Sequence, residues 1–312
     1  RSGAIVGATM KHFDGITDDE RAQLVVKGQM WCTGGVIDGD SQLSFQDIVF
    51  AVEKRSRESV TLVADLTNNA RIIRMYSLDT SGYVIHTDTS LEGGWDNPEL
   101  HYEWNGPVND TEVPKKKIPI FPFTLLSKDD KLMYSKVAYL GDGDRTTIED
   151  SGKIEEKRIF PTDGVQKLMF KKDRGARDSF RGDLNWCAVR SKYFMAAAIP
   201  KDIKRWKTSS EARIVSYNDK DMMWFDFTLS KPLSAGDTAL DIYIGPISYN
   251  TLKNYQENLT EIMELSWRFI RPISITFLWI IKKIHKVIPN WGLVIIVFSI
   301  FIKIILYPLS KS

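Results

Sequence analysis

Up to about Pro246, the chain is a succession of short segments in which apolar and polar residues alternate with period two, a pattern typical of half-buried strands. Turn-forming residues separate these segments, as at residues 141–144 and 234–237. The expected strands are residues 44–52, 59–65, 70–77, 83–89, 131–140, 166–171, 184–190, 193–199, 212–217, 222–229 and 239–244. Because helical periodicity is almost absent before Tyr249, we expect a large antiparallel β-sandwich rather than an α/β fold.

After Pro246 the alternation ends and the spacing of apolar residues becomes helical. Residues 247–272 read as a helix-compatible connector, which the pair Arg271-Pro272 interrupts. In residues 273–289, an apolar stripe lies opposite a lysine face; the stripe is Phe277, Ile280, Ile281, Ile284 and Ile288, and the lysines are Lys282, Lys283 and Lys286. This pattern is typical of an amphipathic helix in a membrane interface. The alternative is an ordinary helix packed on the β-domain.

Residues 290–312 contain an almost continuous apolar run from Trp291 to Leu309. A helix of about 19 residues is roughly 28 Å long at 1.5 Å per residue, which is close to the roughly 30 Å hydrocarbon core of a bilayer. Trp291 and Tyr307 stand near its two ends, where interfacial aromatic residues gather. The sequence therefore predicts a transmembrane helix. The alternative is a buried helix of a soluble protein. It is disfavoured, because too few residues of this run are polar enough to face water.

Lys303 is the one charged residue inside this run. A lysine at the centre of a transmembrane helix costs about 2.5–3.5 kcal/mol on insertion scales. One interpretation is that Lys303, four residues before Tyr307, extends its ammonium group to the nearer interface. The other is that Lys303 faces a hydrated cavity and offers its charge to an acidic group. Since the run contains no carboxylate, that group would come from other helices, lipid headgroups or a client protein.

The composition agrees with a folded protein, because 43% of the 312 residues are hydrophobic and the net charge is +2. This balance gives no electrostatic indication of nucleic-acid binding. His12, His86, His101 and His285 are scattered without metal-ligand spacing, and residues 141–150 lack the spacing of a calcium loop and instead suggest a solvated hairpin turn. We find no arrangement of nucleophile, base and oxyanion hole, so we expect neither an enzyme nor a bound metal or cofactor.

Cys32 and Cys187 each follow a tryptophan and lie far apart in the chain. Neither belongs to a CxxC pair, so a zinc or redox motif is excluded. They are either two buried thiols at sheet positions or a disulfide. Residues 106–123 are proline-rich and contain a lysine run, which favours an exposed loop over a basic binding patch.

The C-terminal motif resembles the first core transmembrane helix of the YidC-type membrane protein insertases. The residues that carry this resemblance are Asn290, Trp291, Gly292, Lys303, Tyr307, Pro308 and Leu309. Residues 273–288 are similar to that family's periplasmic amphipathic helix. Further upstream, residues 241–246 (DIYIGP), 184–200 and 1–13 are similar to strands of its periplasmic domain, so the resemblance extends over the whole chain.

The resemblance implies an antiparallel β-supersandwich in residues 1–246, followed by a short helical membrane segment. It also implies a signal-anchor helix upstream of Arg1, which is not an initiator methionine, and further core helices beyond Ser312. In this family a positive residue on the first core helix lines a hydrophilic, client-binding groove. Lys303 matches that position, where arginine is more frequent, so the charge is kept and the planar fork of arginine is lost.

The implied function is to insert and help fold inner-membrane proteins, alone or with the Sec translocon. The implied partners are the lipid bilayer, nascent membrane-protein clients and Sec translocon subunits. Residues 1–246 would be periplasmic and Ser312 would face the cytoplasm of a bacterium. Lys311 agrees with the positive-inside rule, whereas Lys282, Lys283 and Lys286 would be interfacial anchors on the other side. The alternative is a membrane-anchored carbohydrate-binding or mutarotase-like module, which the same fold would permit.

Overall fold

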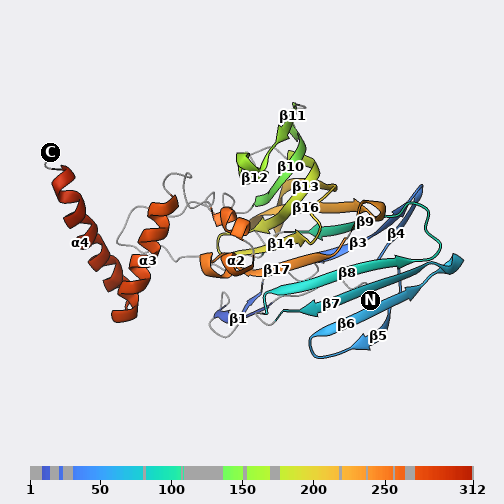
Figure 1. Cartoon of the computed structure of the whole chain (residues 1–312), viewed down its shortest axis with the longest axis horizontal. Helices are drawn as coiled ribbons and strands as arrows, with labels where there is room; N and C mark the ends of the chain where they lie inside the picture. Colours follow the sequence, from blue (N-terminus) through green and yellow to red (C-terminus); the bar gives the residue numbers. More distant parts are fainter. Residues whose placement is uncertain are drawn as a thin grey trace. The chain divides into compact units, whose positions relative to one another are not determined.

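The structure, a computed structural model, describes residues 9–14, 21–23, 31–79, 82–106, 108, 136–149, 153–168, 176–217, 220–236, 238–255, 257–263 and 271–310. It divides into two compact units, Arg1–Leu259 and Thr260–Ser312. The first unit, the β-domain, consists mainly of strands, and the second is helical (Figure 1). A mainly antiparallel β fold followed by short helices is therefore confirmed.

In the β-domain every strand pairing among the described residues is antiparallel. The strands are β1 (Thr9–Asp14), β2 (Arg21–Gln23), β3 (Trp31–Asp38), β4 (Ser41–Ser44), β5 (Ala51–Arg55), β6 (Ser59–Asp65), β7 (Arg71–Leu78), β8 (Val84–Glu92), β9 (Glu99–Asn105), β10 (Lys136–Glu149), β11 (Ile154–Ile159), β12 (Gln166–Leu168), β13 (Ala176–Arg190), β14 (Phe194–Pro200), β15 (Trp206–Tyr217), β16 (Lys220–Pro232) and β17 (Leu240–Pro246). The main sheet has the order β4-β3-β9-β16-β15-β13-β14-β17-β8-β7-β6-β5. Strands β10, β11 and β12 attach to it through β13, while β1 and β2 form a separate ribbon.

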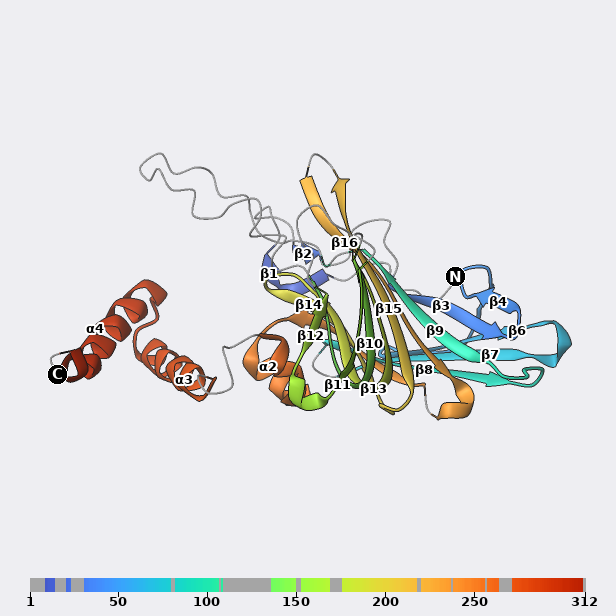
Figure 2. The same ribbon diagram turned by 90° about the horizontal axis from the view of Figure 1, so that it is seen from above.

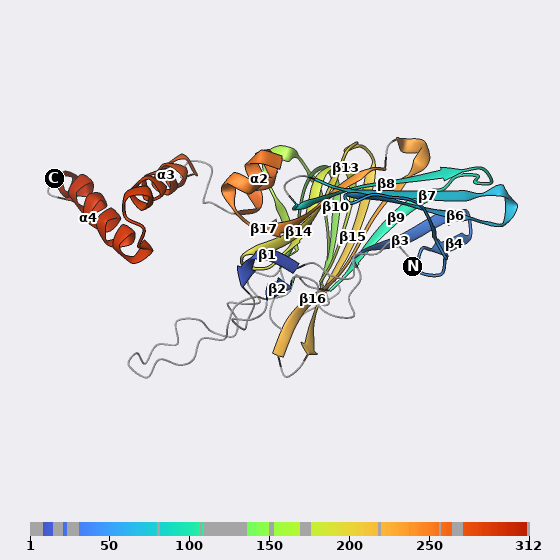
Figure 3. The same ribbon diagram turned by 90° about the horizontal axis from the view of Figure 1, so that it is seen from below.

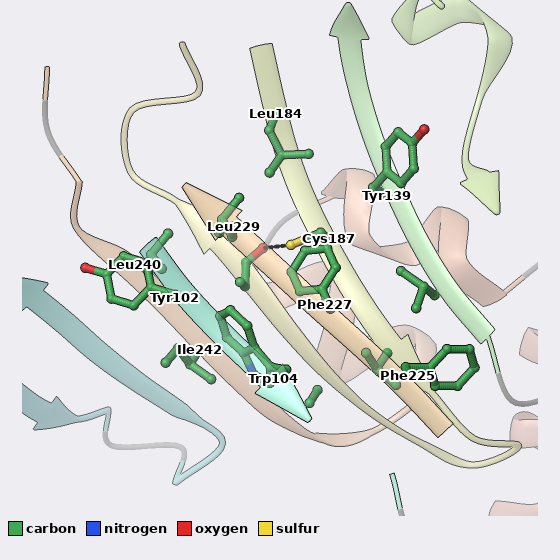
Figure 4. Close-up of a cluster of buried hydrophobic side chains, with 14 of the residues drawn as sticks. Tyr102, Trp104, Tyr139, Leu184, Cys187, Phe225, Phe227, Leu229, Leu240 and Ile242 are labelled. Atoms are coloured by element: carbon green, nitrogen blue, oxygen red, sulfur yellow. Dashed lines mark hydrogen bonds between the residues drawn. The ribbon is translucent and has the colours of Figure 1, made fainter. Parts of the chain in front are cut away.

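The inner faces of this sheet share one hydrophobic core, to which strands far apart in the sheet order contribute. It includes Tyr102 and Trp104 of β9, Phe225, Phe227 and Leu229 of β16, Cys187 and Val189 of β13, and Leu240 and Ile242 of β17. Figure 4 shows labelled side chains of this core meeting from several strands. The Tyr102 hydroxyl donates a 3.4 Å hydrogen bond to the Thr238 carbonyl, next to β17. The long sheet therefore folds back on itself, so that its two halves cover each other's apolar faces.

A second core cluster closes the other end of the sandwich. It contains Val36, Phe45, Ile48, Ala64, Ile72 and Leu100. Arg74 of β7 is fully buried beside it, with its guanidinium 4.1 Å from the centre of the Phe45 ring. The same guanidinium donates a 3.4 Å hydrogen bond to the Cys32 carbonyl of β3. Since β3 and β7 are not sheet neighbours, Arg74 connects the two layers directly.

The expected strand at residues 44–52 is wrong. Strand β4 ends at Ser44 and β5 begins at Ala51, and the residues between them form a turn. Phe45 and Ile48 are buried in the second cluster from that turn. The apolar residues Phe45 and Ile48 gave the sequence pattern of a strand. A turn that lies over a core also buries some of its side chains, so it can produce the same pattern.

The expected turn at residues 141–144 is also wrong, because these residues lie inside β10. Gly141 and Gly143 stand where β10 approaches β13 closely, and a Cβ atom on Gly143 would lie 2.3 Å from the Arg181 carbonyl oxygen. The ring of Phe180 fills the space beside both glycines. The glycines therefore permit close strand packing here and do not mark a reversal of the chain. The hairpin expected at 141–150 is not there, since β10 continues to Glu149.

The other expected strands coincide wholly or in part with β6, β7, β8, β10, β12, β13, β14, β15, β16 and β17. Among the strands that the structure describes, β2, β3, β9 and β11 coincide with no expected strand. Strand β3 contains Gly34 at φ 130° and Gly35, which weaken its strand pattern in the sequence. The outer parts of β15 and β16 pair with each other beyond Ala212 and Asp226 and leave the sheet as a ribbon (Figures 2 and 3).

Cys32 and Cys187 are free and buried, so the interpretation as two buried thiols is confirmed. Burial raises the pKa of Cys32 to about 11, against the opposing effect of the nearby Arg74 charge. Burial also raises the pKa of Cys187, whose thiol lies 3.9 Å from the Ala198 carbonyl oxygen. Both thiols are therefore protonated at neutral pH. Of the proline-rich stretch 106–123, all but Gly106 and Val108 lies outside the described residues.

The connector expected in residues 247–272 begins as the short helix α2 (Tyr249–Tyr255), followed by the 3-10 helix η4 (Glu257–Met263). Helix α2 is attached to the β-domain by polar and aromatic contacts. The Tyr255 hydroxyl donates a 2.8 Å hydrogen bond to Asp79 after β7, and its ring lies 5.5 Å from that of Tyr243 in β17. These contacts fix the start of the connector at the end of the last strand.

The contact between Lys231 and Asp202 allows the contribution of a buried polar contact to the stability of the β-domain to be tested. Lys231 is fully buried, its ammonium lies 2.7 Å from Asp202, and the same ammonium is 5.3 Å from the centre of the Trp206 ring. We expect Lys231→Met to lower the free energy of unfolding by about 2 kcal/mol. This is less than the 3–5 kcal/mol for a fully buried pair, because Asp202 keeps some access to water. Denaturant unfolding of the whole chain in mild detergent measures this, with the exposed Lys54→Met as the control.

The same contact predicts a pH dependence. The hydrogen bond from Lys231 lowers the pKa of Asp202 below its usual range. Stability from this carboxylate is therefore complete above the unfolded-state pKa of about 4 and is lost as pH falls through the lower folded-state value. The stability difference between wild type and Lys231→Met should narrow below about pH 4. A difference that stays constant down to pH 2 would contradict the role of the pair.

Candidate membrane-facing site

The helical unit contains α3 (Arg271–Val287) and α4 (Trp291–Ser310), close to the bounds that the sequence predicts. Helix α3 begins at Arg271, so Pro272 lies in its first turn, where the missing N–H removes no helical hydrogen bond. The expected break at Arg271-Pro272 is thus a helix start. A three-residue connection joins the two helices, which form the C-terminal pair drawn in red in Figure 1.

Asn290 organises the connection between the helices. Its side-chain oxygen accepts hydrogen bonds from the backbone N–H groups of Gly292 at 2.9 Å and Leu293 at 3.3 Å. This is the usual N-cap arrangement, and it satisfies two donors that a helix start leaves open. The His285 ring stacks on the Trp291 ring, with centroids 3.8 Å apart and planes at 19°. Both motif residues, Asn290 and Trp291, therefore serve to fix the α3–α4 turn.

Beyond the turn, α4 packs along α3 through a narrow strip. The Phe277 and Phe298 rings meet edge to face at 5.4 Å between centroids, and Val294 is fully buried. Phe277 is one of the predicted stripe residues, whereas Phe298 and Val294 were not singled out. Their signal is the spacing of four residues, which places both on one face of α4. The pair is held by few contacts and leaves most of α4 uncovered.

Helix α3 has the two faces that the sequence predicts. Ile280, Ile281, Ile284 and Ile288 are half-buried, Phe277 is 37% exposed, and Lys282, Lys283 and Lys286 are exposed. Trp279 was not predicted as part of the site. It is 60% exposed on the lysine side, with the Lys283 ammonium 5.4 Å from its ring centre. An aromatic ring next to lysines is typical of the boundary between lipid and water.

Helix α4 exposes large apolar side chains along its described length. They are Trp291, Leu293, Ile295, Ile296, Val297, Ile300, Phe301, Ile304, Ile305 and Tyr307, each at least 40% exposed. A patch of this kind on a folded protein marks an interaction surface. Within the residues that the structure describes, no helix reaches the length and apolarity of a membrane-crossing segment.

Lys303 is exposed on α4. It follows Val294 by nine residues, which is a rotation of about 180° around a helix of 3.6 residues per turn. Lys303 therefore lies on the side opposite the contact with α3. Ser299 precedes it by one turn on the same side and donates a 2.8 Å hydrogen bond to the Ile295 carbonyl of its own helix.

The structure thus brings some predicted site residues together and leaves others apart. Phe277, Asn290, Trp291 and Gly292 contribute to the α3–α4 contact and turn. Lys303 and the 62% exposed Tyr307 point away from it. The side chains of Pro308 and Leu309 lie outside the described residues.

The two β-domain histidines with described side chains, His86 and His101, have separate carboxylate partners. His86 of β8 lies 2.7 Å from Asp241, which also pairs with Lys201. His101 of β9 is buried 3.5 Å from Glu103. No group of three metal-binding side chains occurs among the described residues. The carbohydrate alternative is therefore not favoured.

Comparison with known proteins identifies the chain's relatives. The family model described as "YidC periplasmic domain" matches residues 1–280. A "Membrane protein insertase YidC" of Chlorobium luteolum is 25% identical over 97% of the chain, and one of Chlorobaculum tepidum is 27% identical over 84%. A third, of Pelodictyon phaeoclathratiforme, is 32% identical over 46% of the chain. The chain spans 48%, 40% and 25% of these relatives, so it corresponds to half of their length or less.

The Asn290 cap can be tested by itself. We expect Asn290→Ala to cost about 1 kcal/mol at the start of α4 and to accelerate amide hydrogen exchange at Gly292 and Leu293 roughly fivefold. Asn290→Asp keeps the accepting oxygen and serves as the control, with exchange close to wild type. Equal exchange in the alanine variant and wild type would show that the cap does not stabilise α4.

Proposed function

The chain belongs to the YidC periplasmic domain family, and from that premise we propose that it is part of a membrane protein insertase. In this proposal the β-domain lies in the periplasm of a bacterium, and α3 and α4 connect it to the inner membrane. The observation that carries the proposal is the helical unit, where α4 exposes a long apolar surface and presents Lys303 on the side away from α3.

We propose that α4 crosses the membrane. The support is the apolar sequence from Trp291 to Leu309, together with the exposed apolar side chains of the helix. Burying such side chains in lipid is favourable by about 25 cal/mol per Å² of apolar surface. Trp291 and Tyr307 would then lie near the two interfaces, where amphipathic rings are stable.

In this proposal Lys303 supplies the positive charge that attracts the client protein. It stands about 12 residues into α4, where an unpaired charge surrounded by lipid would cost about 2.5–3.5 kcal/mol. Water and polar groups in a groove between helices would remove that cost. The ammonium would then attract acidic or polar segments of a client and lower the energy of moving them part-way across the membrane. The client's own apolar helix would partition into lipid, so no covalent step is needed.

Helix α3 sets the depth of the protein in the membrane. Its isoleucine stripe would enter the acyl boundary, and Lys282, Lys283 and Lys286 would remain at the headgroup level. The stacked pair His285 and Trp291 would hold the junction between the interfacial and the crossing helix. This orientation places Ser312 toward the cytoplasm. The partners would be nascent membrane-protein clients and, for some clients, Sec translocon subunits.

The role of Lys303 is tested by complementation. Cells depleted of their own insertase receive the complete protein that contains this chain, with Lys303→Ala or Lys303→Arg. We expect the alanine variant to insert clients with acidic translocated segments roughly tenfold less well, as for loss of a contact to a charged group worth about 1.5 kcal/mol. The arginine variant should insert them normally, because the charge is kept.

Ser299→Ala is the matched control on the same face of α4, and clients without acidic residues in the translocated segment serve as the substrate control. Normal insertion of acidic clients by the Lys303→Ala protein, at wild-type protein level, would exclude a role for the charge.

A further inference from the structure

The charges of this chain are distributed very unevenly. Of its 42 Lys and Arg residues, six lie in residues 271–312, and none of its 40 Asp and Glu residues does. This segment therefore carries a charge of +6, and the preceding 270 residues carry −4. An exposed helix of a soluble protein usually mixes lysine with glutamate at spacings of three and four residues. Residues 271–312 have no such compensation, which indicates an anionic partner.

The lysines of α3 are concentrated on one surface together with an aromatic ring. Lys282, Lys283 and Lys286 fall within two turns and are all exposed. Trp279 lies one turn before Lys283, 60% exposed, with the Lys283 ammonium over its ring. The opposite face of the same helix carries the isoleucine stripe. We call the surface formed by Trp279, Lys282, Lys283 and Lys286 the cationic face of α3.

We propose that the cationic face of α3 binds the phosphate groups of anionic phospholipids, so that the protein selects lipids such as phosphatidylglycerol over zwitterionic ones. This inference rests on the proposed membrane location and adds the identity of the lipid to it. The ammonium groups donate hydrogen bonds to phosphate oxygens. The indole of Trp279 occupies the interfacial layer beside them, where its apolar body and polar N–H are both satisfied.

The partner is a lipid surface because of how the two faces of α3 are arranged. A free anion or an acidic peptide would be recognised by the charges alone and would leave the isoleucine stripe without a function. A bilayer surface contacts both, since its phosphates and acyl chains are stacked in the same order as the lysines and isoleucines. Residues 1–270 carry −4 and are repelled by an anionic membrane, so attraction is confined to residues 271–312.

The expected strength follows from known membrane electrostatics. Each lysine near an anionic surface strengthens binding roughly fivefold, and the effect falls off within a Debye length of about 8 Å at physiological salt. Three lysines together would then give a preference on the order of 100-fold in dilute buffer, reduced severalfold by salt.

The experiment is native mass spectrometry of the complete 312-residue chain, held in a neutral maltoside detergent so that α4 stays covered. An equimolar mixture of phosphatidylglycerol and phosphatidylcholine is added, and the bound lipids are counted. We expect phosphatidylglycerol to exceed phosphatidylcholine at least tenfold on the wild-type chain. Replacing the three lysines by glutamine should bring the ratio close to one, and replacing them by arginine should keep it high.

The matched control replaces three exposed basic residues of the β-domain, Lys54, Arg55 and Lys157, by glutamine, and should retain the wild-type ratio. Excess inorganic phosphate should not displace the bound lipid; displacement at equal concentration would show a free-anion site and overturn the proposal. Equal binding of both lipids to the wild-type chain would also overturn it while leaving the proposed function intact. A chain that binds no lipid and stays soluble without detergent would overturn both.

Discussion

Apolar side chains must be removed from water, and the two units of this protein meet that requirement in different ways. In the β-domain a single antiparallel sheet folds back on itself, so that residues such as Trp206 and Ile242 are fully buried within the protein. In the helical unit, by contrast, α4 covers Val294 against α3 and leaves Ile304 67% exposed. The β-domain buries its core side chains without help from another molecule. The helical unit needs an apolar environment from outside, and the proposed membrane supplies it.

The closed sandwich also determines which groups surround the buried charges of the β-domain. Burial raises the pKa of Asp178 in β13, although Arg145 of β10 lies 2.7 Å away and opposes this shift. Arg74 fills the space between two layers, and Lys231 ties Asp202 to β16. Asp178, Arg74 and Lys231 each contact a charged, polar or aromatic group of another segment. These groups therefore help to fix the register of the fold.

The sequence predicted what depends on local periodicity. The alternation in residues 59–65 corresponds to β6, and the 3.6-residue spacing from Ile273 to Ile288 corresponds to α3. The prediction from sequence was wrong where tertiary contacts determine which residue type is present. Phe45 and Ile48 are apolar because a turn lies over the core, and Gly141 and Gly143 are glycines because a neighbouring strand comes close. The stacking of His285 on Trp291 joins residues of two helices, so the apolar periodicity of neither helix indicates it.

The proposed function depends on α4 lying within a bilayer, and a measurement of the depth of single positions in the membrane tests this. Leu293, Ile300 and Tyr307 are exposed, lie seven residues apart on one side of α4, and can each be replaced by a spin-labelled cysteine, because the native Cys32 and Cys187 are buried. In the chain reconstituted into vesicles, we expect high oxygen and low nickel-chelate accessibility at position 300, and accessibilities typical of the membrane surface at positions 293 and 307. Nickel accessibility at all three positions equal to that of a label at Val49, 81% exposed on the β-domain, would contradict it.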